Sequence, residues 1–153
     1  MEKATFGAGC FWGIEEKFRK TNGVISTRVG YSGGTMKNPT YNEVCSSETG
    51  HAEVVEIVYE PSIVSYEELL NIFWDIHDPT SLNRQGWDIG TQYRSVIFYH
   101  NEEQKKTALL AKQRLEKAGM YKKPIITEIK PVSEFFIAEE YHQRYVEKNQ
   151  RTR

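Results

Sequence analysis

The sequence lacks the features that mark several large classes of protein. Its 153 residues include only two cysteines, and no apolar run is long enough to span a bilayer. The formal net charge is only -1 at pH 7, which argues against a surface for nucleic acid or for an anionic membrane. The N-terminus shows none of the basic, apolar and small-residue regions of a secretory signal. We therefore expect no nucleic-acid or membrane partner, and a cytoplasmic location in which thiols stay reduced.

Metal-ligand spacing and internal divisions are missing as well. The two cysteines and four histidines are scattered without the spacing of a zinc site, so we expect no metal. No repeat, low-complexity tract or linker divides the chain. Its length suits one core, and we expect a single domain over residues 1–153.

One cysteine stands in an unusual setting, the run Gly9-Cys10-Phe11-Trp12-Gly13. The residues that follow place Ile14 and Phe18 at helical spacing, so Cys10 is expected at or just before a helix N-terminus. Unpaired backbone N–H groups and the helix dipole favour an anion there. We therefore expect the pKa of the Cys10 thiol to fall below the free value of about 8.5. The alternative is a buried cysteine that acts only as a small hydrophobic residue.

The order of expected strands and helices predicts an α+β fold, a mixed sheet with helices packed on it. Strands are expected at residues 3–7, 24–31, 51–60, 93–100 and 125–132. Helices are expected after Cys10, after a capping box of Ser65 and Glu68, from Asn101 to Gly119, and from Ser133 to Glu147. Residues 32–50 are rich in Gly, Ser, Thr, Asn and Pro and are expected to form loop and turn.

The motif around Cys10 resembles the signature of the peptide methionine sulfoxide reductases of the A type. Five further blocks match the pattern of this family in order, and the resemblance extends from about residue 4 to about residue 149. These blocks are Gly30-Tyr31-Ser32-Gly33-Gly34, Asn38-Pro39-Thr40-Tyr41, Thr49-Gly50-His51-Ala52-Glu53, His77-Asp78-Pro79-Thr80 and Gly90-Thr91-Gln92-Tyr93-Arg94-Ser95. The resemblance implies a two-layer α/β sandwich with a ferredoxin-like core. It also implies reduction of the S epimer of methionine sulfoxide, peptide-bound or free, to methionine.

The resemblance assigns the chemistry to two residues. Cys10 would attack the sulfoxide sulfur as a thiolate. Glu53 would act as the acid that protonates the sulfoxide oxygen. To hold a proton at neutral pH, Glu53 needs a pKa raised by an apolar, partly desolvated setting.

Five further residues are carried over from the family with supporting roles. The hydroxyl groups of Tyr41 and Tyr93 would bind the sulfoxide oxygen, and Asp88 would order the site. Phe11 and Trp12 would hold the substrate methyl group against an apolar wall. Between these blocks, Trp87 and Ile89 are larger and more apolar than the family pattern leads us to expect, so they could shape the rim of the pocket.

Recycling is where the sequence departs from many relatives. The reaction leaves Cys10 as a sulfenic acid, and no cofactor is implied because thiols supply both electrons. Many members resolve this acid with cysteines in a glycine-rich C-terminal tail, which this sequence lacks. We expect an external thiol reductant, such as glutathione with glutaredoxin or thioredoxin itself. The alternative is resolution by Cys45.

Other functions share parts of this pattern. A cysteine-dependent thiol peroxidase would also use an activated Cys10, and a sulfoxide-binding or redox-sensing module would keep the pocket without turnover. A Cys10–His51 pair would suggest hydrolase chemistry, but we expect His51 to be structural.

Overall fold

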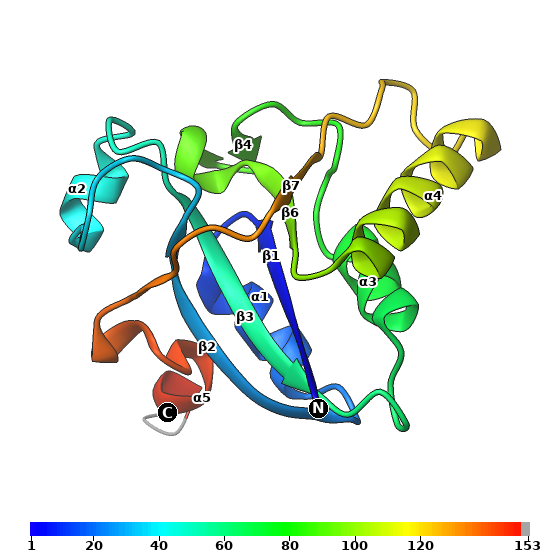
Figure 1. Cartoon of the computed structure of the whole chain (residues 1–153). Helices are drawn as coiled ribbons and strands as arrows, with labels where there is room; N and C mark the ends of the chain where they lie inside the picture. The colour runs from blue at the N-terminus through cyan, green and yellow to red at the C-terminus, as the bar shows by residue number, and fades with distance from the viewer. Residues whose placement is uncertain (151–153) are drawn as a thin grey trace.

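The centre of the protein is a six-stranded mixed sheet in the order β7-β6-β1-β3-β2-β8 (Figure 1). The structure is a computed structural model that describes residues 1–150. All neighbouring strands are antiparallel except β6 and β7, which are parallel. The strands are β1 (Glu2–Ala8), β2 (Val24–Ser32), β3 (Ala52–Tyr59), β6 (Ser95–Tyr99), β7 (Glu128–Pro131) and β8 (Phe136–Ile137).

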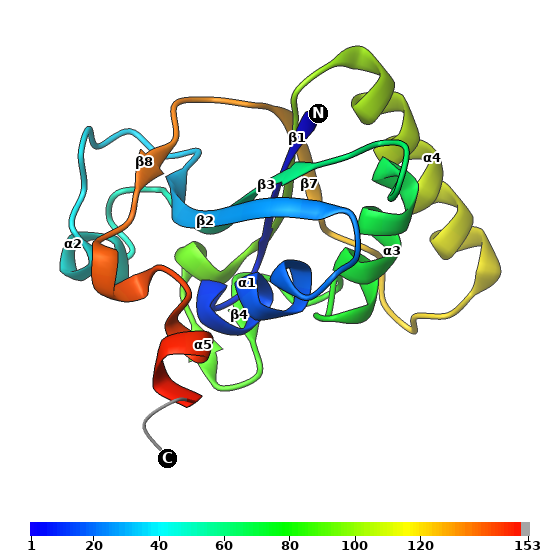
Figure 2. The ribbon, with the colours of Figure 1, turned by 90° about the horizontal axis from the view of Figure 1, so that it is seen from below.

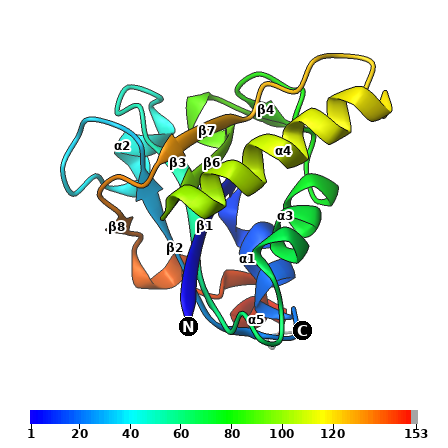
Figure 3. The ribbon, with the colours of Figure 1, turned by 45° about the vertical axis from the view of Figure 1, so that its right-hand side comes forward.

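One face of this sheet is covered by helices and carries most of the core. Phe6 of β1 stacks between Phe18 and Phe73, with ring centroids 5.4 and 5.1 Å away, and so joins two helices to the sheet. Figure 3 shows the long helix α4 running beside β6 and β7. The helices are α1 (Phe11–Arg19), α2 (Tyr41–Cys45), α3 (Tyr66–Asp75), α4 (Glu102–Ala118) and α5 (Tyr145–Gln150).

Most of the expected elements are present with the expected boundaries. Ser65 and Glu68 form a reciprocal capping box at the start of α3. Asn101 caps α4, which ends at Gly119 in the left-handed conformation. The expected α+β sandwich, a mixed sheet with packed helices, is confirmed. No helix in residues 1–150 is both long enough and apolar enough to cross a membrane.

Two short elements lie where the sequence predicts only loop. Helix α2 begins at a second capping box, in which the Thr40 hydroxyl accepts from the Glu43 N–H and the Glu43 carboxylate accepts from the Thr40 N–H. The strands β4 (Arg84–Gln85) and β5 (Asp88–Ile89) form a tight hairpin. Residues 91–93 form a 3-10 turn, so β6 begins at Ser95 rather than at Tyr93.

The prediction of one helix from Ser133 to Glu147 is wrong. Residues 136–137 instead pair with β2, residues 140–142 form a 3-10 turn, and only residues 145–150 are α-helical. The cause is the Gln143 side chain, whose amide accepts from the Val29 N–H and donates to the carbonyl oxygens of Val29 and Ala138. Two of these bonds tie the segment to β2, and the third fixes the extended path within the segment. The segment thereby returns to α1, and α5 lies beside α1 (Figure 2).

Candidate active site

Cys10 joins the end of β1 to the first turn of α1, where the sequence predicts it. It is the N-cap residue of α1, and its side chain makes no capping hydrogen bond. The preceding Gly9 has φ 107°, a conformation that favours glycine. A side chain at Gly9 would also meet the Cγ of Gln85 at 3.0 Å. Gly9 thus sets the direction in which the chain presents Cys10.

The expected low pKa of the Cys10 thiol is wrong for the substrate-free protein. This pKa is raised to about 12, mainly by burial, with smaller contributions in the same direction from the charges of Glu53 and Asp88. The nearby backbone N–H of Trp12 lowers it, but loss of hydration is the larger effect. Cys10 is therefore a thiol at rest, and the thiolate must form when substrate is bound.

Glu53 lies directly beside the start of α1. It shares a face of β3 with the core residues Val55 and Ile57. Its side chain is 1% exposed, and Oε1 accepts from the Phe11 N–H at 3.1 Å. Its Oε2 is buried and has no hydrogen-bond partner among residues 1–150. Burial, as the largest cause, raises the Glu53 pKa to about 8, so the carboxyl group is mostly protonated at pH 7.

Tyr41 and Tyr93 bring two hydroxyl groups to the same place from different elements. Tyr41 is the first residue of α2 and Tyr93 the last of the 3-10 turn. Burial raises the pKa of Tyr41, and it raises that of Tyr93 to about 12. Glu53 contributes to both shifts, and Cys10 and Asp88 act on Tyr93 as well. Both hydroxyls are therefore neutral hydrogen-bond donors at neutral pH.

The pocket holds Cys45 in addition to the expected residues. The Cys45 thiol lies near both tyrosine hydroxyls, and its pKa is raised, mainly by burial. Cys45 ends α2 four residues after Tyr41, so one short helix supplies both groups. The sequence offers this position only as an alternative resolving thiol, without its contact to the tyrosines.

Asp88 lies on β5, outside the buried part of the pocket. Its side chain is exposed, yet its charge raises the pKa values of Cys10, Glu53 and Tyr93. Asp88 therefore lies close enough to the reaction centre to influence three of its groups.

The aromatic wall is built from two distant parts of the chain. The Trp12 indole N–H donates to Nδ1 of His142 at 2.8 Å, and Tyr145 stacks on Trp12 with centroids 3.9 Å apart and planes 10° apart. Phe11 is almost fully buried and supports the wall from the core, against His142 and Tyr31. Trp12 is the partly exposed face of this wall.

Sequence reasoning missed the C-terminal contribution to this wall. His142 is fully buried among the rings of Phe11, Trp12 and Tyr41. The Glu139 carboxylate accepts from the Tyr31 hydroxyl and from the Tyr41 N–H, each at 2.9 Å. Most of these contacts join residues about 100 or more positions apart, and no local pattern signals them.

Two other candidate features do not join the site. His51 accepts from the Gly34 N–H at Nδ1 and bonds the Met36 carbonyl oxygen at Nε2, so both ring nitrogens serve the loop, as a structural histidine requires. Within residues 1–150, no group of three or more His, Cys, Asp or Glu side chains could hold a metal ion.

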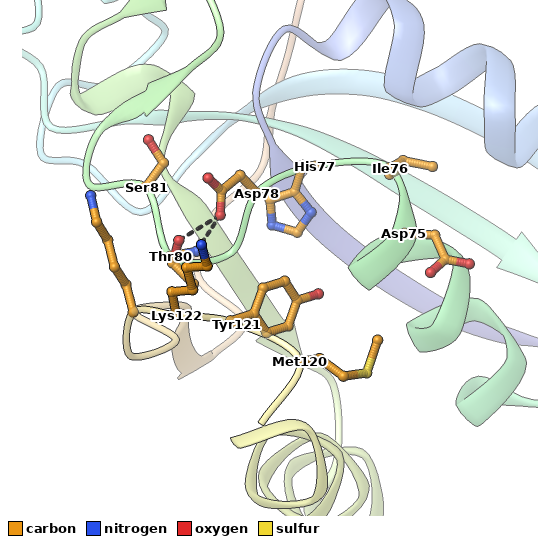
Figure 4. A pocket seen from close by; sticks show the side chains of 10 residues that line it. Asp75, Ile76, His77, Asp78, Thr80, Ser81, Met120, Tyr121 and Lys122 are labelled. Carbon is orange, nitrogen blue, oxygen red and sulfur yellow. Dashed lines mark hydrogen bonds between the residues drawn. The ribbon is translucent and has the colours of Figure 1, made fainter. Parts of the chain in front are cut away.

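A cavity of about 620 Å³ lies at the end of α3, apart from the residues above (Figure 4). Asp75 and Asp78 line it together with Lys122 and Lys123. Asp78 is already engaged, because one carboxylate oxygen accepts from both the N–H and the hydroxyl of Thr80. The Asp78 backbone also supports the β4–β5 hairpin, through hydrogen bonds with the Gln85 side chain.

Comparison with known proteins agrees with this geometry. Residues 2–153 match the family model described as peptide methionine sulfoxide reductase. The chain is 65% identical over 148 residues to a curated peptide methionine sulfoxide reductase MsrA of Methanosarcina acetivorans, covering 97% of this chain and 79% of that protein.

Solved structures show the same similarity. The crystal structure of Mxr1 from Saccharomyces cerevisiae in reduced form has a TM-score of 0.88 at 39% identity, covering 97% of this chain and 86% of that chain. A structure of Mxr1 in complex with Trx2 has a TM-score of 0.63 at 27% identity, covering 94% of this chain and 84% of that one.

Proposed function

The chain belongs to the peptide methionine sulfoxide reductase family, and we propose that its reaction is carried out by Cys10 as nucleophile and Glu53 as acid. The enzyme reduces the S epimer of methionine sulfoxide, the activity of its A-type relatives. The observation that carries the assignment is the Glu53 carboxyl group, which is buried beside the Cys10 helix start and has one oxygen without a hydrogen-bond partner among the described residues. A buried, protonated carboxyl with a free oxygen is suited to donate a proton to a bound oxygen atom.

The reaction transfers one oxygen atom between two sulfur atoms. The Cys10 thiolate forms a bond to the sulfoxide sulfur while Glu53 gives its proton to the sulfoxide oxygen. The oxygen then passes to Cys10, methionine leaves, and Cys10 becomes a sulfenic acid. The proton that Cys10 lost replaces the one that Glu53 gave, so the step consumes no net proton.

Tyr41 and Tyr93 would polarise the S–O bond. Their hydroxyls meet at Cys45 in the substrate-free protein, and we propose that the sulfoxide oxygen takes over these donors. Neutral hydroxyls aimed at a developing negative charge stabilise the transition state. Asp88 would order the site from its rim.

Trp12, supported by Phe11, would hold the methyl group of the substrate. Its indole is locked by His142 and Tyr145, so the apolar face and the oxygen donors keep fixed relative positions. A rigid pair of this kind accepts one epimer at sulfur and rejects the other.

We propose that an external thiol resolves the sulfenic acid. Two thiols reduce it to the Cys10 thiol and water and leave as a disulfide, which supplies the two electrons. The Mxr1 structure in complex with Trx2 supports a protein reductant of the thioredoxin type. A cytoplasmic location would suit this cycle, because Cys10 and Cys45 are both free thiols and the cytoplasm keeps thiols reduced. Residues 1–153 would act as one domain.

Glu53→Gln tests the assignment of the acid. The amide keeps the shape but has no acidic proton, so single-turnover release of methionine should slow at least a hundredfold. Glu56→Gln is a matched control on the same strand, where Glu56 pairs with Arg28, and it should keep the wild-type rate. Alkylation of Cys10 by iodoacetamide should stay as fast in Glu53→Gln, or become faster, because the Glu53 charge raises the Cys10 pKa. Wild-type turnover in Glu53→Gln would refute the assignment.

A further inference from the structure

The β4–β5 hairpin and the loop before it expose three large apolar side chains to solvent. Trp87, at the turn, is 96% exposed, Ile89 is 65% exposed, and Leu82 in the preceding loop is 74% exposed. Exposed apolar groups gathered on one loop commonly mark a binding surface. A tryptophan at the turn is notable because its large ring adds nothing to the folded core.

The hairpin that carries Trp87 is firmly held. The Gln85 side-chain amide clamps the Asp78 backbone, accepting from its N–H at 2.8 Å and donating to its carbonyl oxygen at 2.7 Å. The Arg84 Nε donates to the Gly86 carbonyl oxygen at 2.9 Å. Gly86 takes the positive φ (59°) suited to the first turn position of a two-residue hairpin. The exposed ring therefore stands on a rigid support, as a preformed contact requires.

This support adjoins the reaction centre. The Gln85 side chain packs against Gly9, the residue before Cys10. Asp88 pairs with Gln85 across the hairpin, and its charge acts on Cys10 and Glu53. Trp87 is two residues from Gln85 along the chain, so their backbones are at most about 7 Å apart. Trp87 thus stands beside the mouth of the pocket.

We propose that Trp87, together with Ile89, binds an apolar side chain of a polypeptide substrate two residues from the oxidised methionine. This inference rests on the proposed function and specifies its substrate class. In an extended peptide, side chains two residues apart share a face and lie about 7 Å from each other, so a neighbour of the oxidised methionine can extend beyond the pocket toward the hairpin. Methionines commonly lie among apolar residues. An unfolded segment would therefore supply the flanking apolar contact, whereas free methionine sulfoxide has no group that reaches Trp87.

The test compares three substrates with dithiothreitol as the only reductant. The first is a blocked pentapeptide with methionine S-sulfoxide at the centre, glycine beside it and leucine at both ends. The second has glycine in place of both leucines, and the third is free methionine S-sulfoxide. Trp87→Ser should lower kcat/KM for the leucine peptide about tenfold, mainly by raising KM. Trp87→Phe should restore most of that loss.

The control variant is Ile63→Ser, which alters another exposed apolar residue (54% exposed) in the loop before α3. It should leave all three substrates unchanged. An equal loss for all three substrates in Trp87→Ser, or no loss for any, would overturn the inference. So would a loss that appears only when thioredoxin replaces dithiothreitol, because the surface would then serve the reductant. If the wild-type protein reduced none of the three substrates, the proposed function itself would fail.

Discussion

Cys10 and Glu53 are both protonated in the resting protein, for the same physical reason. Each is buried, and loss of hydration disfavours the thiolate and the carboxylate alike. The two pKa values are about 12 and about 8, so at pH 7 the pair holds two protons. Thiolate attack assisted by an acid needs one proton on this pair, and that proton belongs on Glu53. The site is thus neutral at rest and becomes reactive only through its substrate.

This arrangement predicts an unusual dependence on pH. Below pH 8 the pair must lose one proton to react, so kcat/KM for a blocked methionine sulfoxide should rise about tenfold per unit. Between pH 8 and 12 the pair holds one proton in total, so kcat/KM should level above about pH 8. In Glu53→Gln only Cys10 titrates, and the lower kcat/KM should keep rising past pH 8. A wild-type kcat/KM that falls between pH 7 and 9 would contradict the pairing of thiolate and acid.

At the scale of elements, the C-terminal segment does more for the site than its secondary structure suggests. The Glu15 carboxylate of α1 accepts from the Arg144 N–H at 2.7 Å, and Gln143 holds the segment to β2. Next to these anchors, His142 accepts the hydrogen bond of the Trp12 indole N–H. The Trp12 indole nitrogen can only donate a hydrogen bond, so Nδ1 of His142 must be the acceptor and carries no proton. The lowered pKa of His142, caused mainly by burial, keeps it in that form.

The Gln143 anchor predicts a measurable loss of stability. Gln143→Leu should leave the buried Val29 N–H and the Ala138 carbonyl oxygen without these partners, while the Val29 carbonyl oxygen keeps the Ala138 N–H. We expect the free energy of unfolding to fall by about 2 to 4 kcal/mol. Denaturant unfolding measures this loss. The matched control is Gln113→Leu on the exposed side of α4, which should change stability by less than about 0.5 kcal/mol. Equal stability of the two variants would show that the Gln143 anchor contributes little.

At the scale of the whole molecule, local patterns predict the sheet and its main helices well. The ends of β1, β2 and β3 lie within one residue of those expected, and Ser65 and Asn101 cap α3 and α4 as expected. The C-terminal segment could not be predicted, because its path depends on a side chain that bonds a strand 114 residues away. Helix α2 could have been found, since Thr40 and Glu43 have the spacing of a capping box.

The candidate site also has parts that the sequence predicts and parts that it does not. The family resemblance assigns Cys10 and Glu53 to one reaction, and the structure brings Glu53 to the start of the helix that Cys10 caps. The expected sign of the Cys10 pKa shift is wrong, because the sequence shows a helix N-terminus but not the depth of burial. The contact of Cys45 with two tyrosines and the support of Trp12 by His142 depend on tertiary packing alone.

The most direct test of the account is a single turnover without reductant. Reduced protein is mixed with excess methionine S-sulfoxide, methionine is counted, and the intact mass is measured beside Cys10→Ser and Cys45→Ser. We predict one methionine per chain and one added oxygen on Cys10 for the wild type and for Cys45→Ser, and no methionine for Cys10→Ser. A Cys10–Cys45 disulfide in place of the added oxygen would contradict resolution by an external thiol. Methionine release that persists in Cys10→Ser, or none from the wild type, would contradict the central claim that Cys10 reduces the sulfoxide.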